Sequence, residues 1–207
     1  MSASARLAAA GMTTSTVVAL TAGMSMLQPL STDLYLPALP AIASHFDASV
    51  ATVQWTLSVF IAVFGLWQLV AGPLTDRYGR YPLIMLGATV YALASALCML
   101  APSMAVLVIG RALQGLGACT CLVGARAFVR DLYTPSEGAR MIAGAATIMS
   151  FAPLLGPIIG AQLANAFGWR AAFAVPGLLA IGAGWLFARH CPPETEAPAR
   201  RSTKARV

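Results

Sequence analysis

Two ionisable side chains, Asp33 and Arg111, lie well inside long apolar stretches of the sequence. A charge at the centre of a membrane-spanning helix costs about 2.5–3.5 kcal/mol on insertion scales, so such side chains normally face a cavity or a partner. Pro40 follows Asp33 by seven residues and Met104 precedes Arg111 by seven, which predicts that both lie roughly 10 Å below the same membrane surface. The pair is therefore either a permanent ion pair that fixes helix packing or a site for protons and substrate.

In the second interpretation, Asp33 exchanges protons, because burial opposes its charge while a nearby Arg111 favours it. Gln114 lies one helical turn after Arg111 and would add a polar group to the same cavity. We expect these three side chains to form the proton-coupling and substrate cavity.

A second group of charges, Asp76, Arg77 and Arg80, lies in the short segment Gly72–Leu83 between two apolar runs. We expect Gly72 and Pro73 to end one helix, Gly79 to permit a backbone angle that bulky residues resist, and Pro82 to lie in the first turn of the next helix. The segment is thus predicted to be a tight charged turn, which serves either as a topology anchor or in a more specific role.

A third feature is a series of small and kinked positions. Pro153, Gly156, Pro157 and Gly160 follow i+3 and i+4 spacings and share one helix face. Small residues let a neighbouring helix approach closely, and prolines bend a helix. Close helix packing is one sufficient explanation of this face.

The elements that must position these residues follow from composition. The chain has 207 residues, of which 58% are apolar and 10% charged, with a mean hydropathy of +0.76. A membrane span needs about 20 apolar residues. Six stretches qualify, so we predict an all-α membrane protein in which residues 15–190 form a six-helix transmembrane bundle. The predicted spans are 15–40, 52–71, 82–101, 104–125, 141–164 and 169–188.

The basic residues predict the orientation. Eleven Lys and Arg side chains lie on the amino-terminal side of the predicted spans and one, Arg170, on the opposite side. Because cytoplasmic loops carry the excess of Lys and Arg, both termini are expected in the cytoplasm. Residues 1–14 are then a short cytoplasmic tail, and residues 191–207 a disordered one. Basic residues at span ends set topology, so we expect no nucleic-acid partner despite a pI of about 9.6.

No catalytic or metal-binding pattern is visible. The two His, seven acidic residues and four Cys show neither zinc spacing nor a catalytic constellation, and no phosphate-binding Gly-Lys loop occurs. We therefore expect no enzymatic activity, no metal and no cofactor, with a proton gradient as the energy source.

Five strings resemble signatures of the major facilitator superfamily or of one of its groups. G-P-L-T-D-R-Y-G-R-Y-P-L (72–83) resembles its loop between helices two and three, with Tyr81 where a second basic residue is usual. R-A-L-Q-G (111–115) resembles its helix-four signature. S-T-D-L-Y-L-P-A-L-P (31–40) and A-R-A-F-V-R-D-L-Y (125–133) closely resemble the Bcr/CflA drug-resistance group. P-L-L-G-P-I-I-G (153–160) resembles the helix-five signature of exporters, from which Ala152 and Ala161 depart.

The resemblance implies roles for individual residues. The helix-four Arg, here Arg111, is implicated in proton coupling, and the loop Asp, here Asp76, in gating. Arg126 or Arg130, at the cytoplasmic end of helix four, is a plausible local partner of Asp76. The helix-five signature, with Gly156 at its first glycine, is associated with export.

The resemblance also implies a fold and a function. Six helices are one half of the family's twelve, built as a 3+3 inverted repeat, and the glycine turns near Gly79 and Gly168 echo such a repeat. We expect a drug:proton antiporter in the bacterial inner (plasma) membrane, in a truncated form, that contacts membrane lipid and exports drug-like molecules of unidentified structure. The alternative is a non-transporting fragment or a half-transporter subunit that needs a second six-helix half, supplied by another chain or a homodimer.

Overall fold

The computed structural model describes residues 13–191, and within this range the chain is helical without strands. Most of the two predicted tails, 1–14 and 191–207, lies outside the described residues. The all-α prediction is confirmed for the described part. Its helices are α2 (Thr14–Ser25), α3 (Leu27–Asp33), the 3-10 helix η1 (Leu36–Ala38), α4 (Leu39–His45), α5 (Val50–Tyr78), α6 (Arg80–Met99), α7 (Met104–Leu132), α8 (Pro135–Met149), α9 (Ala152–Phe167) and α10 (Ala171–His190).

Five stretches of the described chain are long and apolar enough to cross a membrane: α5, α6, α7, the α8–α9 pair and α10. The chain is therefore a multi-pass membrane protein. The first predicted span, 15–40, is not one continuous helix but is built from α2, α3, η1 and the start of α4. The fifth predicted span, 141–164, is likewise split between α8 and α9.

Prolines account for these breaks. The helices α2, α3 and α8 each end four residues before a proline, at Pro29, Pro37 and Pro153 respectively. A proline ring lacks the amide hydrogen and clashes with the carbonyl four residues earlier, so the hydrogen-bond ladder stops there. In η1 and α9 the proline then occupies the first turn of the next helix, where no amide donor is required.

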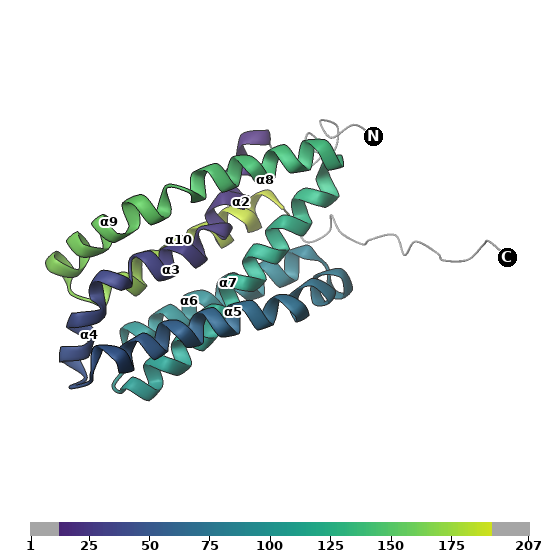
Figure 1. Ribbon diagram of the computed structural model, residues 1–207. Coiled ribbons are helices and arrows are strands. Elements are labelled where there is room, and N and C mark those ends of the chain that lie inside the picture. The colour runs from purple at the N-terminus through teal and green to yellow at the C-terminus, as the bar shows by residue number, and fades with distance from the viewer. Residues whose placement is uncertain (1–12, 192–207) are drawn as a thin grey trace.

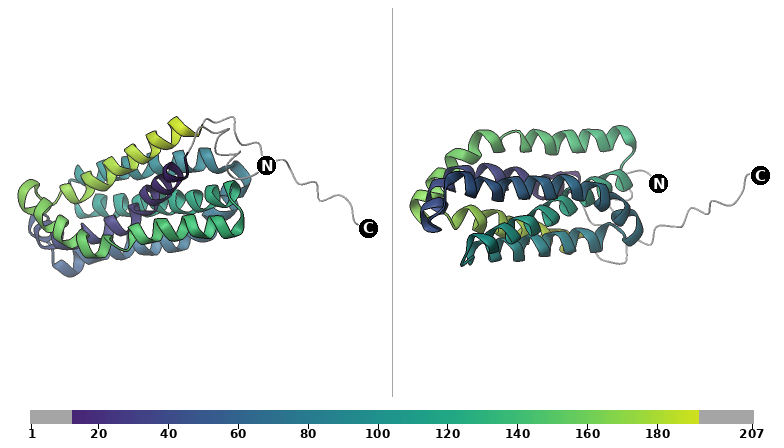
Figure 2. Two further views of the ribbon diagram at one scale, coloured as in Figure 1. Left: turned by 90° about the horizontal axis from the view of Figure 1, so that it is seen from above. Right: turned by 60° about the horizontal axis from the view of Figure 1, so that its bottom comes forward.

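The helices form an elongated bundle with its connections at two ends (Figure 1). The α5–α6 and α7–α8 turns lie at one end, while the α4–α5, α6–α7 and α9–α10 connections lie at the other. In Figure 1, α5, α6 and α7 form the lower side, α2, α3 and α10 the middle, and α8 and α9 the upper side. The right-hand view of Figure 2 also shows α8 and α9 along one edge of the bundle.

The charged turn differs from the prediction at its start. Gly72 and Pro73 do not end a helix, because α5 continues through Pro73 to Tyr78. The hydroxyl of Thr75 donates to the carbonyl of Ala71 at 2.6 Å, which adds a side-chain bond across the turn that follows the proline. The chain reverses at Gly79, whose φ of 92° favours glycine, and Pro82 lies in the first turn of α6 as predicted.

A matching reversal joins α9 to α10. There Gly168 follows the last residue of α9 with a φ of 77°. Gly79 and Gly168 are the glycines with positive φ in residues 13–191, and each directly follows a spanning helix. The two turns therefore share one backbone conformation, as the similar sequences around the two glycines predict.

The core is centred on α7, which packs against both α5 and α6. Of its most apolar stretch, 61% is buried, against 11% for α5 and 17% for α8–α9. A methyl group added at Gly117 would lie 2.7 Å from the backbone nitrogen of Tyr91, so α6 and α7 are in backbone contact. This close packing fixes the position of the side chains that α7 carries into the bundle.

Candidate functional site

Arg111 lies on α7 and is fully buried within the helices of this chain. Its guanidinium donates to the Oε1 of Gln114 at 3.0 Å and to the backbone carbonyl of Ser31 at 3.1 Å. The same group lies over the rings of Tyr35 and Phe60, 4.5 and 4.4 Å from the ring centroids. Aromatic faces and carbonyl oxygens are weak counterparts for a cation, so this charge is held by geometry rather than by an opposite charge.

A polar network extends from Arg111 through the bundle. Gln114 donates from Nε2 to the hydroxyl of Ser95 on α6 at 2.8 Å. The hydroxyls of Ser31 and Tyr91 are hydrogen-bonded to each other, which joins α3 to α6. The hydroxyls of Tyr35 and Thr56 lie 2.5 Å apart and join the chain after α3 to α5. Sequence reasoning missed these hydroxyl groups, because isolated Ser, Thr and Tyr in apolar runs carry no distinguishing pattern.

Asp33 is the last residue of α3 and points to a different side of that helix. Its neighbours are Thr32, whose hydroxyl lies 3.1 Å from Oδ1, and the backbone of α9 at Gly156. The other carboxyl oxygen, Oδ2, has less than 1 Å² of exposed surface and no hydrogen-bond partner.

An ion pair between Asp33 and Arg111, which was one of the two alternatives from the sequence, is not formed. Within residues 13–191, the acidic partners in ion pairs are Asp76 and Asp131, and both pair with Arg80. Ser31, which contacts Arg111, and Asp33 are two positions apart on α3, or about 200° around the helix. The sequence placed the two charged residues at a similar depth, but it could not show that they lie on different sides of α3. Arg111 and Gln114 are also enclosed by the bundle rather than open to a cavity.

The predicted small face of helix five is partly confirmed. Gly156 and Gly160 on α9 are buried against α3 and the residue that follows it. A methyl group at Gly156 would lie 2.5 Å from the Cβ of Asp33, and one at Gly160 would lie 2.8 Å from the carbonyl oxygen of Leu34. Pro153 is exposed and Pro157 half-buried, so the prolines shape α9 rather than form the contact.

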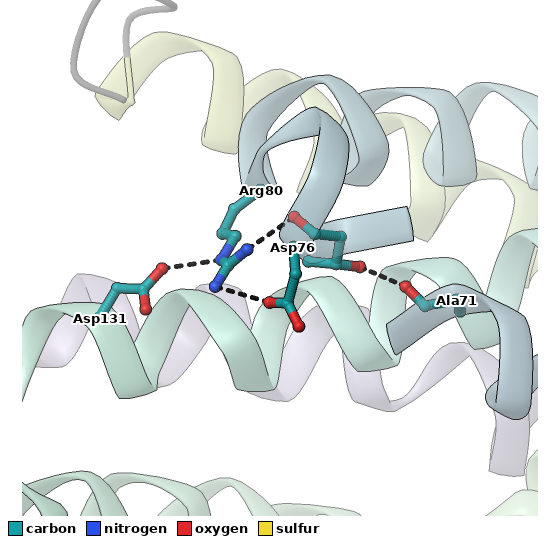
Figure 3. Close-up of polar contacts among 5 residues, drawn as sticks. Ala71, Asp76, Arg80 and Asp131 are labelled. Atoms are coloured by element: carbon teal, nitrogen blue, oxygen red, sulfur yellow. Dashed lines mark hydrogen bonds and ion pairs between the residues drawn. The ribbon is translucent and has the colours of Figure 1, made fainter. Parts of the chain in front are cut away.

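The charged turn is organised by Arg80 (Figure 3). Its guanidinium contacts Asp76 at 2.9 Å, Asp131 at 2.7 Å and the carbonyl of Thr75 at 2.6 Å. Asp131 lies near the end of α7, so one arginine joins α5, α6 and α7. Arg77 instead lies over the ring of Tyr78, 5.3 Å from its centroid.

This arrangement corrects the expected partner of Asp76. Arg126 and Arg130 are exposed on α7, and the ion pair of Asp76 is with Arg80 on the adjacent turn. The contribution of α7 to the cluster is the acidic Asp131, which sequence reasoning passed over. Its position next to Arg130 and one residue before the end of α7 was the available signal.

The cysteines and the other potential metal-binding side chains do not form a second candidate site in the described residues. Cys98, Cys119, Cys121 and Cys191 are buried, and the first three are free thiols. Within the described range, no three side chains of His, Cys, Asp or Glu are grouped closely enough to hold a metal ion.

Comparisons with known proteins agree with this architecture. Residues 21–207 match the family model of the Major Facilitator Superfamily. The chain is 37% identical over 174 residues to the chloramphenicol resistance protein of Pseudomonas aeruginosa, which covers 82% of this chain and 42% of that protein. It is 35% identical over 156 residues to the multidrug resistance protein MdtL of Escherichia coli O81 (strain ED1a), with 75% of this chain and 40% of that protein covered.

A solved structure shows the same fold. It is the crystal structure of a bacterial homologue of the human lysosomal transporter Spinster, in an inward-facing and unoccupied conformation, with a TM-score of 0.64 and 21% identity. The match covers 91% of this chain and 47% of that one. The chain thus spans about two fifths of the length of the curated relatives it matches. From the model match over most of its length, the chain belongs to the Major Facilitator Superfamily.

Proposed function

We propose that this chain is a six-helix unit of a proton-coupled exporter of drug-like small molecules in the bacterial inner membrane. The observation that carries the proposal is the unpartnered carboxyl oxygen of Asp33, in a helix whose other side is bonded to the fully buried Arg111. Ionisable groups placed inside spans without fixed counter-charges are the usual carriers of coupling protons.

Two further observations support export of such molecules. Curated relatives are named for chloramphenicol resistance and multidrug resistance. Gly156 and Gly160 belong to the string that resembles the helix-five signature of exporters. Their contact with α3 and the residue that follows it gives this string a physical role next to Asp33. The chloramphenicol relative makes chloramphenicol the first substrate to test.

We further propose that the end of the bundle with the α5–α6 turn faces the cytoplasm. Arg77, Arg80 and Arg189 lie at that end, whereas Arg170 follows α9 at the other. An excess of basic residues marks the cytoplasmic side of membrane proteins. Asp76, Arg80 and Asp131 would then form a gating cluster at the cytoplasmic surface.

The experiment measures chloramphenicol flux in proteoliposomes under an imposed proton gradient, with the chain both monomeric and cross-linked as a dimer. Asp33→Asn keeps the side-chain shape but cannot exchange a proton, so we expect it to abolish gradient-driven flux while membrane insertion is retained. Asp47→Asn, an exposed residue with a φ of 48° that Asn also tolerates, is the matched control. Gradient-driven flux that survives Asp33→Asn, or no flux from any form of the chain, would refute the proposal.

The alternative function is that of a half-transporter subunit without activity of its own. The apolar face of α5 favours it: Trp55, Leu66 and Leu69 are 68, 69 and 77% exposed. Leu154 and Ile158 on α9 are also exposed, at 64 and 60%. A second six-helix unit would cover such faces, and lipid would cover them in its absence.

A further inference from the structure

The helix α3 contacts its neighbours through two unlike sides. Ser31 accepts a bond from Arg111 of α7 and bonds Tyr91 of α6, and Tyr35, one turn after Ser31, bonds Thr56 of α5. These polar bonds fix α3 to the α5–α6–α7 part of the bundle. The side with Asp33 faces α9, and within residues 13–191 no side-chain hydrogen bond joins α9 to α3.

The contact between α3 and α9 depends on two glycines. Gly156 has no Cβ and so leaves room for the Cβ of Asp33. A Cβ added at position 156 would lie 2.5 Å from that atom. Gly160 does the same for the backbone of Leu34, where the nearest approach would be 2.8 Å. The two chain segments are therefore in direct contact at these two points, and Oδ2 of the half-buried Asp33 side chain has less than 1 Å² of exposed surface.

The hydrogen bonds around Asp33 fit the neutral acid. The hydroxyl of Thr32 has a single hydrogen, and the carbonyl of Pro29 lies nearer to it, at 2.8 Å, than Oδ1 of Asp33, at 3.1 Å. A protonated Asp33 can instead donate to the oxygen of Thr32, which completes a chain from carboxyl to hydroxyl to carbonyl. Asp33 as a whole is half-buried, but a carboxylate in the same place would keep Oδ2 out of contact with water and leave Oδ1 with one shared donor, which is costly.

We propose that Gly156 is a positioning residue that lets α9 close over the protonated side chain of Asp33, and that loss of the proton separates α9 from α3. The proton passes to water that enters as the contact opens. The break between α8 and α9, at Ser150 and Phe151 ahead of Pro153, is the place where α9 can swing without moving α8. The proposal rests on the proposed function in one respect, since it takes Asp33 as the group that exchanges the proton.

Few other charges bear on this contact. The charged side chain nearest α3 on a packed element is Arg111 of α7, which lies on the Ser31 side of the helix. In the described chain, α2, α9 and η1 contain no charged or titratable residue, and those of α10, Arg189 and His190, lie in its last turn. Asp33 is therefore the group whose titration can act on α9 directly.

The experiment measures the distance between α9 and the fixed part of the bundle as a function of pH. Spin labels are placed at Leu154 on α9 and Leu93 on α6, which are 64 and 67% exposed, in the full chain in lipid nanodiscs with the native cysteines replaced by Ala. Electron–electron double resonance is recorded from pH 5 to 9. We expect a single closed distance at low pH that gives way to a longer one as the pH rises.

Three variants separate the causes. Asp33→Asn should keep the closed distance at every pH, because the amide mimics the protonated acid. Gly156→Ala should show the longer distance at every pH. Gly182→Ala on α10, where an added Cβ meets nothing within 4 Å, should behave as the unmodified chain. If Gly156→Ala does not fold, the comparison of Asp33→Asn with the unmodified chain decides.

Two results would overturn the inference: one distance distribution at all pH values in the unmodified chain, or a pH response that persists in Asp33→Asn. Failure of the proposed function looks different. A chain that moves α9 through Asp33 but never exports chloramphenicol would refute the function alone. Proton-driven export without the pH-dependent movement would refute the inference alone.

Discussion

At the scale of single residues, Arg111 and Arg80 show two ways of holding an arginine. Arg111 is enclosed by aromatic rings and bonded to uncharged oxygens, whereas Arg80 bridges two carboxylates at the bundle end. The first arrangement fixes a buried helix contact. The second lies where water can compete, since the side chains of Asp76 and Asp131 are 67 and 46% exposed. The side chain of Arg80 is only 16% exposed, but pairs whose carboxylates are this open to solvent contribute only about 0.2–1 kcal/mol to stability.

A prediction follows for Asp131. Because its charge adds little stability but ties α7 to the turn, Asp131→Asn should change the unfolding free energy by less than about 1 kcal/mol. In the active assembly it should lower turnover about tenfold, or about 1.4 kcal/mol in barrier, with little change in substrate affinity, as should Asp76→Asn. Turnover and affinity are measured in the flux assay and stability by thermal unfolding. A pure loss of affinity with normal turnover would contradict the gating role.

The residues of the candidate site were unequally predictable. Asp33 and Arg111 stand out in any hydropathy reading, because charges inside spans are rare. Their separation could not be predicted, since it depends on which side of α3 meets α7 and which meets α9. The partners of Ser31 and Tyr91 could not be predicted, although Ser31 opens the recognised string 31–40. A hydroxyl group in an apolar run is as compatible with a backbone bond as with a long-range one.

At the scale of elements, the proline spacing could have predicted more than hydropathy alone. Span lengths gave the right order of helices, but they merged α8 with α9 and α2 with α3, because an average over 20 residues does not detect a break. In each case the helix ends four residues before the proline. Helices α5, α9 and α10, however, continue through Pro73, Pro157 and Pro176, so proline spacing alone does not decide where a helix ends.

The two glycines of the charged turn allow a matched test. Gly79→Ala places a Cβ on a residue with a φ of 92°, so it should destabilise the chain by about 1 kcal/mol or more. Gly72→Ala, which is inside α5 and meets nothing within 4 Å, should be neutral or stabilising by up to about 1 kcal/mol. Thermal unfolding of both variants in one detergent makes the comparison. Equal destabilisation by the two would contradict the assigned end of α5.

At the scale of the whole molecule, the described helices leave apolar faces of α5 and α9 exposed. The buried polar groups do not themselves require a second unit, because Arg111 and Gln114 are enclosed by this chain's own helices. A single six-helix unit in a membrane can remain folded, because lipid can cover Leu66 and Leu69. Lipid cannot, however, form the second wall of a substrate path, so a single unit is expected to lack transport activity. Transporters of this type move two such units about a site between them.

We therefore predict that verified monomers of the chain do not transport. Proteoliposomes are prepared at a dilution that keeps the chain monomeric, as checked by cross-linking, and compared with cross-linked dimers and with mixtures containing a complementary six-helix unit. Flux in either assembled form, and none in monomers, is the expected result. Substrate-driven proton flux from monomers would contradict the prediction.

The length of the central helices places the Arg80 cluster in a particular layer. Both α5 and α7 contain 29 residues, or about 43 Å, whereas the hydrocarbon layer is about 30 Å thick. Their charged ends must therefore reach the headgroups, at the same end of the bundle where Arg189 lies over the ring of Trp185. Under the proposed function, we expect lipid phosphates there to compete with Asp76 and Asp131 for Arg80. Anionic lipid content would then act on the proposed gate from the membrane surface, as the proton gradient would act on Asp33 in the interior.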